Sequence, residues 1–272
     1  MQKLQFLKGN LLSVLIWPAL CLLLGIALWG ATLARYPFLL RRDPSRQARL
    51  REMTALFLAG KEFAAVGGLE LSDEMAVAIA AQACLPVLEL GLAAYQRFVG
   101  IVVHPDEVVA PREITDEHGI VHRYEEVLSG EAMEGGPVML SWRDVSEAGS
   151  SAATGYNVVI HEFVHVLDMH DGAVDGMPPL PDAATRRHWR LVMEASYNRL
   201  CRAVDAGAET FLDPYGAEGI EEFFPVAAEA FFVAPHALRE EQPQLYDLFV
   251  DYFRQDPGQE LPPPPEPAPA PA

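Results

Sequence analysis

The chain has 272 residues, enough for one substantial domain with its own core, and its three cysteines (Cys21, Cys84, Cys201) give neither a disulfide framework nor metal-ligand spacing. The formal net charge is −18, but residues 1–51 hold eight of the 20 Lys and Arg and one of the 38 Asp and Glu. The rest of the chain is therefore strongly acidic and should repel nucleic acid and anionic lipid, which excludes direct nucleic acid binding by that part.

The first predicted element is a hydrophobic helix over residues 11–34, after a short flank at residues 1–10. These residues carry no charge and, as a helix, would span about 36 Å, more than the ~30 Å hydrocarbon core of a bilayer. Residues 35–50 then form a basic segment, and its arginines predict a membrane anchor with the following domain in the cytoplasm. A cleaved signal peptide or a soluble packing helix, which would leave a soluble cytoplasmic protein, are the alternatives.

The middle of the chain alternates helical and strand patterns, and we expect an α+β domain, dominated by helices, with a small β-sheet. The pattern predicts helices at residues 45–65, 73–99, 155–170, 182–206, 219–233 and 242–254, and strands at residues 100–103, 123–128 and 137–142. Residues 139–142 are the candidate edge strand to which an extended peptide could add. Residues 171–179 are expected to form a loop near the site, which either shapes the cleft or ends the helix before it.

The most specific pattern in the chain is His161-Glu162-Phe163-Val164-His165. Two histidines four residues apart lie on one face of a helix and can hold a single metal ion. A glutamate directly after the first histidine lies beside that ion, where it can take a proton from a water that the metal activates. The flanking residues are apolar, so a buried helix is expected, and two histidines inside it need partners. The pattern predicts a zinc site built for hydrolysis, most often of peptide bonds.

A catalytic zinc needs a third protein ligand and an open position. A metzincin would have glycine at 168 and histidine at 171, but Asp168 and Asp171 stand there, so that class is excluded. A second helix, residues 219–233, offers Glu222 and Glu229, which are seven apart and share a face. Pro225 is expected in the first turn of that helix, which would put Glu222 near its start.

The C-terminal residues 258–272 are rich in Pro and Ala and contain no aromatic residue, so we expect a disordered tail. The domain before it is expected to cover residues 51–257.

The chain resembles the Mlc titration factor A family of zinc-dependent peptidases. The resemblance rests on blocks in a fixed order at residues 84–92, 129–130, 136–142, 157–168, 213, 215, 222–232 and 255–257. It implies a lethal-factor-like zincin fold, one zinc ion per chain with His161, His165 and Glu222 as ligands, and Glu162 as the catalytic base. It also implies aminopeptidase-type activity on peptides and binding of a transcriptional repressor.

Three further roles are hypotheses. Tyr215 either donates a hydrogen bond to the reacting carbonyl oxygen or packs as an ordinary tyrosine. Glu229 is expected to contact one of the metal ligands and not the metal itself. Asp168 either bonds a ligand imidazole or solvates the helix end. Two function classes follow, a zinc peptidase or a regulatory protein that sequesters a repressor; Glu162 favours the peptidase, because a structural metal site needs no base.

Overall fold

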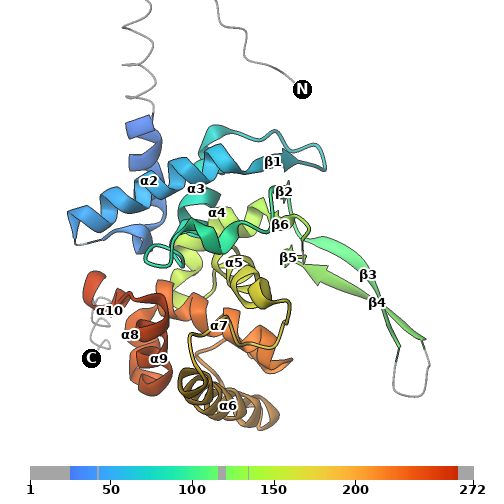
Figure 1. Ribbon diagram of the computed structural model, residues 1–272. Helices are drawn as coiled ribbons and strands as arrows, with labels where there is room; N and C mark the ends of the chain where they lie inside the picture. Colours follow the sequence, from blue (N-terminus) through green and yellow to red (C-terminus); the bar gives the residue numbers. More distant parts are fainter. Residues whose placement is uncertain (1–24, 42, 116–120, 134, 263–272) are drawn as a thin grey trace, which may run out of the picture.

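A computed structural model of the chain describes residues 25–41, 43–115, 121–133 and 135–262. Helices dominate it, and a small sheet lies on one side of the molecule (Figure 1). The predicted α+β class is confirmed. Two helices near the centre, α5 (Val158–Asp168) and α7 (Ile220–Val233), pack against each other and carry the residues discussed below.

The main sheet has four strands in the order β1-β2-β6-β5. Its strands are β1 (Glu62–Ala65), β2 (Gly100–His104), β5 (Gly130–Ala132) and β6 (Val138–Ser141); β1, β2 and β6 run parallel, and β5 is antiparallel to β6. The predicted edge strand at residues 139–142 was therefore wrong, because β6 is paired on both sides. The edge on this side of the sheet is β5, a strand too short for its own periodicity to be visible in the sequence.

A second, two-stranded sheet is an antiparallel hairpin of β3 (Val108–Thr115) and β4 (Val121–Leu128). The hairpin extends away from the helices (Figure 1). A single residue, Ser129, separates β4 from the edge strand β5. The base of the hairpin is thereby fixed at the edge of the main sheet.

The other helical segments surround α5 and α7. They are η1 (Pro37–Leu39), α2 (Pro44–Gly60), α3 (Asp73–Cys84), η2 (Leu92–Tyr95), α4 (Trp142–Ser151), η3 (Ala152–Thr154), η4 (Met169–Asp171), α6 (Ala183–Asp205), η5 (Pro214–Ala217), α8 (Pro235–Glu241), α9 (Pro243–Phe253) and α10 (Pro257–Glu260). The centre of the core is aromatic: Phe163 of α5 contacts the rings of Phe57, Tyr95 and Phe98 at centroid distances of 5.1 to 5.6 Å. This packing holds α5 between the helices and the sheet.

Three of the differences between the predicted and the observed bounds have a clear physical cause. The helix expected at 45–65 ends at Gly60, and its last residues form β1, because pairing with β2 decides their conformation. The helix expected at 73–99 ends at Cys84, because Pro86 has no N–H to bond back to the Gln82 carbonyl. Strand β6 ends at Ser141, whose side chain accepts a hydrogen bond from Asp144 N and so begins α4.

The predicted anchor at residues 11–34 lies mostly outside the described residues. Its described part, residues 25–34, belongs to a helix that ends at Arg35 and packs on the domain through buried Trp29 and Thr32. The Arg35 guanidinium donates to the carbonyl of Ser146 at 2.9 and 3.0 Å. In the part of the chain that the structure describes, no helix combines the length and the apolar character needed to cross a membrane.

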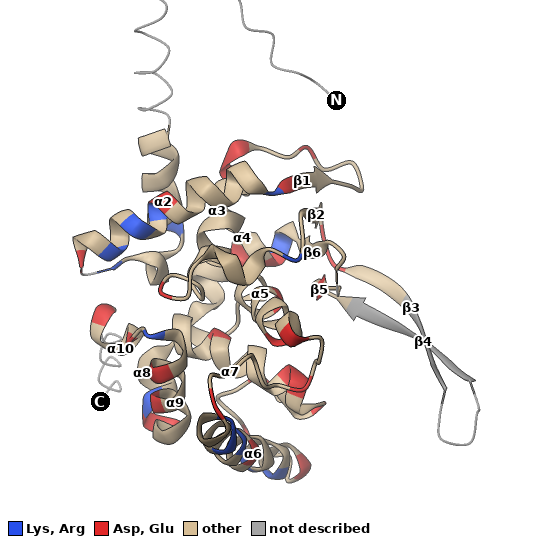
Figure 2. Cartoon of the chain, viewed as in Figure 1, with Lys and Arg blue, Asp and Glu red and all other residues tan. Residues whose placement is uncertain are grey.

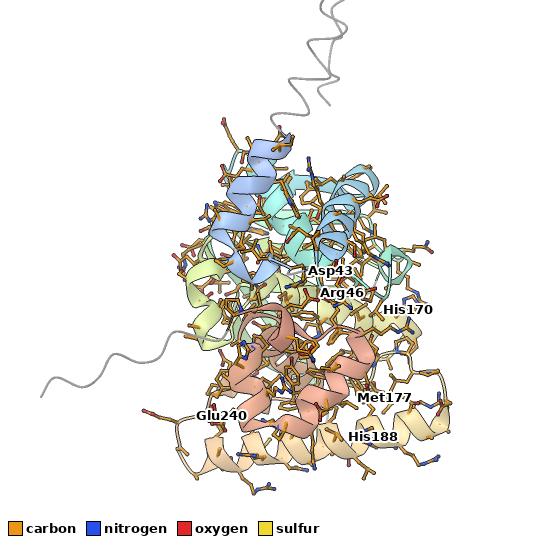
Figure 3. The ribbon with its side chains drawn as sticks, turned by 90° about the vertical axis from the view of Figure 1, so that its left-hand side faces the viewer. Asp43, Arg46, His170, Met177, His188 and Glu240 are labelled. Carbon is orange, nitrogen blue, oxygen red and sulfur yellow. The ribbon has the colours of Figure 1, made fainter. Side chains whose placement is uncertain are left out.

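The segment after this helix also belongs to the packed core, through buried Tyr36, Phe38 and Leu39. Basic residues lie along α2 (Figure 2). One of them, Arg46, forms ion pairs with Glu89 and with Glu260 of α10. Arg46 lies where α2 meets the C-terminal helices (Figure 3). The packed unit therefore includes residues before 51 and after 257. Of the predicted tail, residues 258–260 are helical and residues 263–272 lie outside the described part.

Candidate metal centre

Helix α5 carries the two histidines and the glutamate in its middle, and nearly all of the helix is buried. Asn157 caps it, with its side-chain oxygen accepting from Ile160 N at 2.9 Å, which is worth about 1 kcal/mol of helix stability. His161, Glu162 and His165 are all buried, in a helix whose other residues are almost entirely apolar. Such groups remain in a core only where other polar groups or an ion compensate their lost hydration.

Helix α7 brings the predicted third ligand to the same place. It begins at Ile220, so Glu222 lies in its first turn, as expected. Pro225 lies beyond the first turn, contrary to expectation. Because proline has no N–H, the helical hydrogen bond from residue 225 to the carbonyl of Glu221 is not formed. Seven residues after Glu222, Glu229 faces the same histidine, which agrees with the predicted shared face.

Three atoms from these helices form a small triangle. His161 Nε2 and His165 Nε2 are 3.1 Å apart, and each is 3.2 Å from Glu222 Oε2. Burial opposes the ionisation of Glu222, but its hydrogen bonds to His161 and His165 lower its pKa well below the ordinary value. Among the described residues, this is the one group of three or more metal-ligating side chains.

A buried hydrogen-bond network lies behind His161. Its Nδ1 is 2.7 Å from Glu229 Oε1, and the other oxygen of Glu229 accepts from Asn157 N. The Asn157 side chain donates in turn to Gln82 Oε1 at 2.8 Å. Gln82, Asn157 and Glu229 are almost completely buried. The network therefore fixes the ring of His161 and directs its Nε2 towards the triangle.

Glu162 lies against the edge strand of the sheet. A Cβ atom added to Gly130 of β5 would be 2.5 Å from Glu162 Oε1, so a glycine is required for this approach. Burial raises the pKa of Glu162 to about 8; His161 opposes this shift, while Glu222 and Glu229 add to it. A cation beside Glu162 would lower that pKa towards neutrality, the range in which a general base works best.

Gly130 also exposes its backbone to the cleft. Ser141 N donates to Ser129 O at 2.7 Å, and these two residues lie opposite each other in the register of β5 and β6. Bonded and non-bonded pairs alternate in an antiparallel ladder, so the N–H and C=O of Gly130 point away from β6, towards the free edge. An extended peptide could pair with them.

A cavity of about 180 Å³ opens beside Glu162 and His161. Its other lining residues are Leu128, Ser129, Gly130, Tyr156, Val158, Asp213, Tyr215, Val226 and Glu229. Tyr215 is 37% exposed, and its ring centroid is 6.0 Å from that of His161. The structure thus brings Tyr215 to the site, at the rim of the cavity.

Asp168 makes no hydrogen bond to His165 in the structure. Its carboxylate accepts from Gly176 N at 2.9 Å, and Trp189 Nε1 donates to the carbonyl of Gly176 at 2.8 Å. Among the described residues, neither His165 Nδ1 nor Asp168 Oδ1 has a hydrogen-bond partner. The predicted bond from Asp168 to an imidazole is therefore not formed in the structure. Through its hydrogen bond with Gly176 N, Asp168 instead holds the loop after α5 against the start of α7, where Gly176 contacts Ile220.

Several residues of the site had no role assigned from the sequence. They are Gln82, Leu128, Gly130, Tyr156, Val158, Asp213 and Val226. Asn157 could have been identified as a helix cap from its place before an apolar run. The others come from the strands β4 and β5, the helices α3, α5 and α7, and the residues before α5 and η5, which only the tertiary fold brings together.

Comparisons with known proteins agree with this geometry. The family model described as glucose-regulated metallo-peptidase M90 matches residues 24–254. Mlc titration factor A of Salmonella arizonae is 36% identical over 239 residues, which cover 86% of this chain and 93% of that protein. Mlc titration factor A of Salmonella schwarzengrund is 35% identical over 238 residues (86% and 88%), and the Synechocystis sp. protein slr2042 is 35% identical over 232 residues (84% of each chain). The residues that the family model matches include every member of the site described above.

Proposed function

The chain belongs to the glucose-regulated metallo-peptidase family, and from this premise we propose that it hydrolyses peptide bonds with one zinc ion held by His161, His165 and Glu222. One observation carries the proposal: three donor atoms form a triangle with sides of 3.1 to 3.2 Å, and a buried glutamate lies beside it.

The donor set fits zinc. Two imidazole nitrogens and one carboxylate oxygen are the ligands of many catalytic zinc sites. With metal–ligand bonds of 2.0–2.1 Å, tetrahedral geometry places ligand atoms ~3.3 Å apart, close to the distances in this triangle. When Nε2 of His161 is a ligand, its Nδ1 carries the proton and donates a hydrogen bond to Glu229 Oε1, which agrees with the 2.7 Å distance between these atoms.

Each residue then has a role in the reaction. When bound, the zinc ion would lower the pKa of water and polarise the substrate carbonyl. Glu162 accepts the proton of the attacking water and returns it to the leaving amine. Gly130 pairs with the substrate backbone, and the hydroxyl of Tyr215 donates to the carbonyl oxygen as negative charge develops on it.

We also propose aminopeptidase-type action. The carboxylates of Asp213 and Glu131 lie near the site, since Asp213 lines the cavity and Glu131 raises the pKa of Glu162. A protonated substrate N-terminus is attracted to such a region. Cleavage of peptides with free N-termini and loss of cleavage after N-acetylation is the expected result; equal cleavage of both would assign an endopeptidase.

The general base is tested by Glu162→Gln in the full chain. We expect zinc to be retained and peptide hydrolysis to fall by about 10²- to 10⁴-fold, since the amide cannot take the proton. Glu147→Gln, on the exposed side of α4, is the matched control and should keep full activity. Unchanged hydrolysis by the Glu162→Gln protein would refute the mechanism.

A regulatory role is the second candidate, because the relatives are named for titrating Mlc. In that role the protein would sequester a transcriptional repressor, with hydrolysis secondary or absent. The Glu162→Gln protein separates the two candidates. Repressor binding retained without hydrolysis shows that binding does not need the base, whereas wild-type protein that cleaves no peptide leaves the regulatory candidate alone.

We also propose that residues 11–34 anchor the chain in a membrane with the following domain in the cytoplasm. This proposal rests on the uncharged sequence of residues 11–34 and on the arginines after them. We expect the full chain to stay with membranes after an alkaline carbonate wash, with its domain cleaved by protease in inverted vesicles but protected in intact spheroplasts. Recovery in the soluble fraction would support the soluble cytoplasmic alternative.

A further inference from the structure

The cavity beside Glu162 has a size and a lining that suit one amino-acid side chain. Its volume is about 180 Å³, and His161 and Glu162 form part of its wall. We propose that it is the specificity pocket of the enzyme, which receives one uncharged, apolar side chain, up to phenyl size, from the residue next to the cleaved bond. This inference rests on the proposed peptidase function and adds the class of substrate.

The volume limits the occupant. An engineered apolar cavity of ~150 Å³ in another protein binds benzene. A cavity of about 180 Å³ is only slightly larger, so it accepts the side chain of Leu, Met or Phe. The two fused rings of tryptophan exceed it, and the methyl group of alanine leaves most of it unfilled.

Part of the buried wall is apolar. Val158 at the start of α5 and Val226 of α7 are 3% and 4% exposed, and Leu128 lies at the end of β4. The Tyr156 hydroxyl lies beside the Ser129 side chain, whose hydroxyl also donates to Glu107 Oε1 at 3.5 Å. An apolar side chain entering the cavity removes the apolar surface of Val158, Val226 and Leu128 from water.

Charged side chains are disfavoured for two reasons. The lining residues that the structure describes include the carboxylates of Glu162, Glu229 and Asp213 but no lysine or arginine, so an acidic side chain is repelled. Both oxygens of Glu229 are occupied by His161 and Asn157, and Asp213 accepts from Tyr215 N. Asp213 is assigned above to the substrate N-terminus and Glu162 to the attacking water, so a lysine inside the cavity would lose its hydration without gaining a buried acceptor of its own.

The position of the cavity connects it to the reaction. Glu162 and Gly130 lie in its wall, and Gly130 is the residue whose backbone faces the free edge of the sheet. A peptide paired with Gly130 can therefore direct one side chain into the cavity while its carbonyl lies near Glu162. The occupant is for this reason assigned to the residue beside the cleaved bond.

The test measures kcat/KM for peptides that differ at one residue, using the full, zinc-loaded chain. Wild type should prefer Leu, Met or Phe over Asp, Lys and Trp by at least about tenfold. Leu128→Trp, which fills the cavity, should shift the preference to Ala, while Leu128→Ala and Val226→Ala should extend it to Trp. Leu56→Ala, at an exposed leucine of α2, is the matched control and should keep the wild-type profile.

A second readout does not require hydrolysis. Fluorescence anisotropy measures binding of the same peptides to zinc-loaded Glu162→Gln protein, with and without Leu128→Trp, and thermal unfolding confirms that each variant is folded. Selective binding of the Leu and Phe peptides that Leu128→Trp abolishes supports the pocket, even if wild type cleaves no peptide and the proposed function fails. Hydrolysis with one and the same side-chain profile in all variants, or a wild-type preference for Asp, Lys or Trp, overturns the pocket and leaves the peptidase function in place.

Discussion

The site has two walls that the fold supports to different extents. The metal wall consists of His161, Glu162 and His165 on α5 with Glu222 and Glu229 on α7, two helices in direct contact within the core. The substrate wall consists of residues 128–130 and the turn η5 with Asp213 and Tyr215, where a strand end and a short helical turn approach the cleft.

The two walls differ in burial and in the number of hydrogen bonds that hold them. The metal wall is buried, and hydrogen bonds extend from it through Asn157 to Gln82 of α3, so it is held before any ligand arrives. The substrate wall contains exposed residues, Tyr215 among them, and its contact with the metal wall depends on the missing side chain of Gly130. We expect changes in the metal wall to alter metal affinity and changes in the substrate wall to alter turnover.

The largest effect on that comparison is expected at Gly130. In Gly130→Ala the new methyl group would overlap Glu162, so the base must move, and a displacement of about 1 Å can cost about 10²-fold in rate. Metal content should not change. The rate of peptide hydrolysis and zinc analysis measure both; Gly60→Ala, where the added atom meets nothing within 4 Å, is the control. Full activity in Gly130→Ala would show that the substrate wall does not position the base.

A smaller effect is expected at Glu229. Glu229→Gln weakens the hold on His161, because an amide cannot accept from both His161 and Asn157 with its two heavy atoms. Zinc affinity should fall by about 10- to 100-fold, with one ion still bound at saturating zinc. Competition with a chelator gives the affinity, and Glu241→Gln, at an exposed residue at the end of α8, serves as control. An unchanged affinity would separate the network from the metal wall.

The smallest effect concerns stability and pH. Burial raises the pKa of Asp168 from 3.8 to about 6, so the folded state keeps a proton that the unfolded state has released. The contribution of Asp168 to the free energy of unfolding of the metal-free protein should therefore fall as pH rises from about 4 to about 6, by about 1.4 kcal/mol per pH unit. Asp168→Asn keeps an acceptor for Gly176 N and should remove this fall.

Urea unfolding of both proteins at pH 4, 5, 6 and 7 measures this difference, with Asp171→Asn as a neighbouring control. Parallel pH profiles for the wild type and Asp168→Asn would contradict the assignment of the fall to Asp168.

The sequence predicted the metal wall well, for a physical reason. Helical spacing fixes which side chains share a face, so His161 could be paired with His165, and Glu222 with Glu229, from periodicity, while the family resemblance joined Glu222 to the two histidines as one ligand set. The helix-dominated α+β class followed from the same patterns. Local patterning of this kind is independent of how the rest of the chain folds.

The substrate wall could not be predicted in that way. Strand β5 has three residues, and its place at the sheet edge depends on pairing with β6, which the sequence indicated only as a strand. The role of Gly130 depends on its distance to Glu162, a contact across 32 positions of the chain. The helix expected at 45–65 gave way to β1 for the same reason: non-local pairing overrides local preference.

Metal analysis of the full chain tests the central claim most directly. Wild type, Glu222→Ala and the neighbouring control Glu221→Ala are purified side by side, and zinc per chain is measured by mass spectrometry of the element. One zinc ion per chain is expected in the wild type and in Glu221→Ala, because only Glu222 belongs to the triangle with His161 and His165, and zinc should be lost from Glu222→Ala. Zinc retained in full by Glu222→Ala would contradict the account.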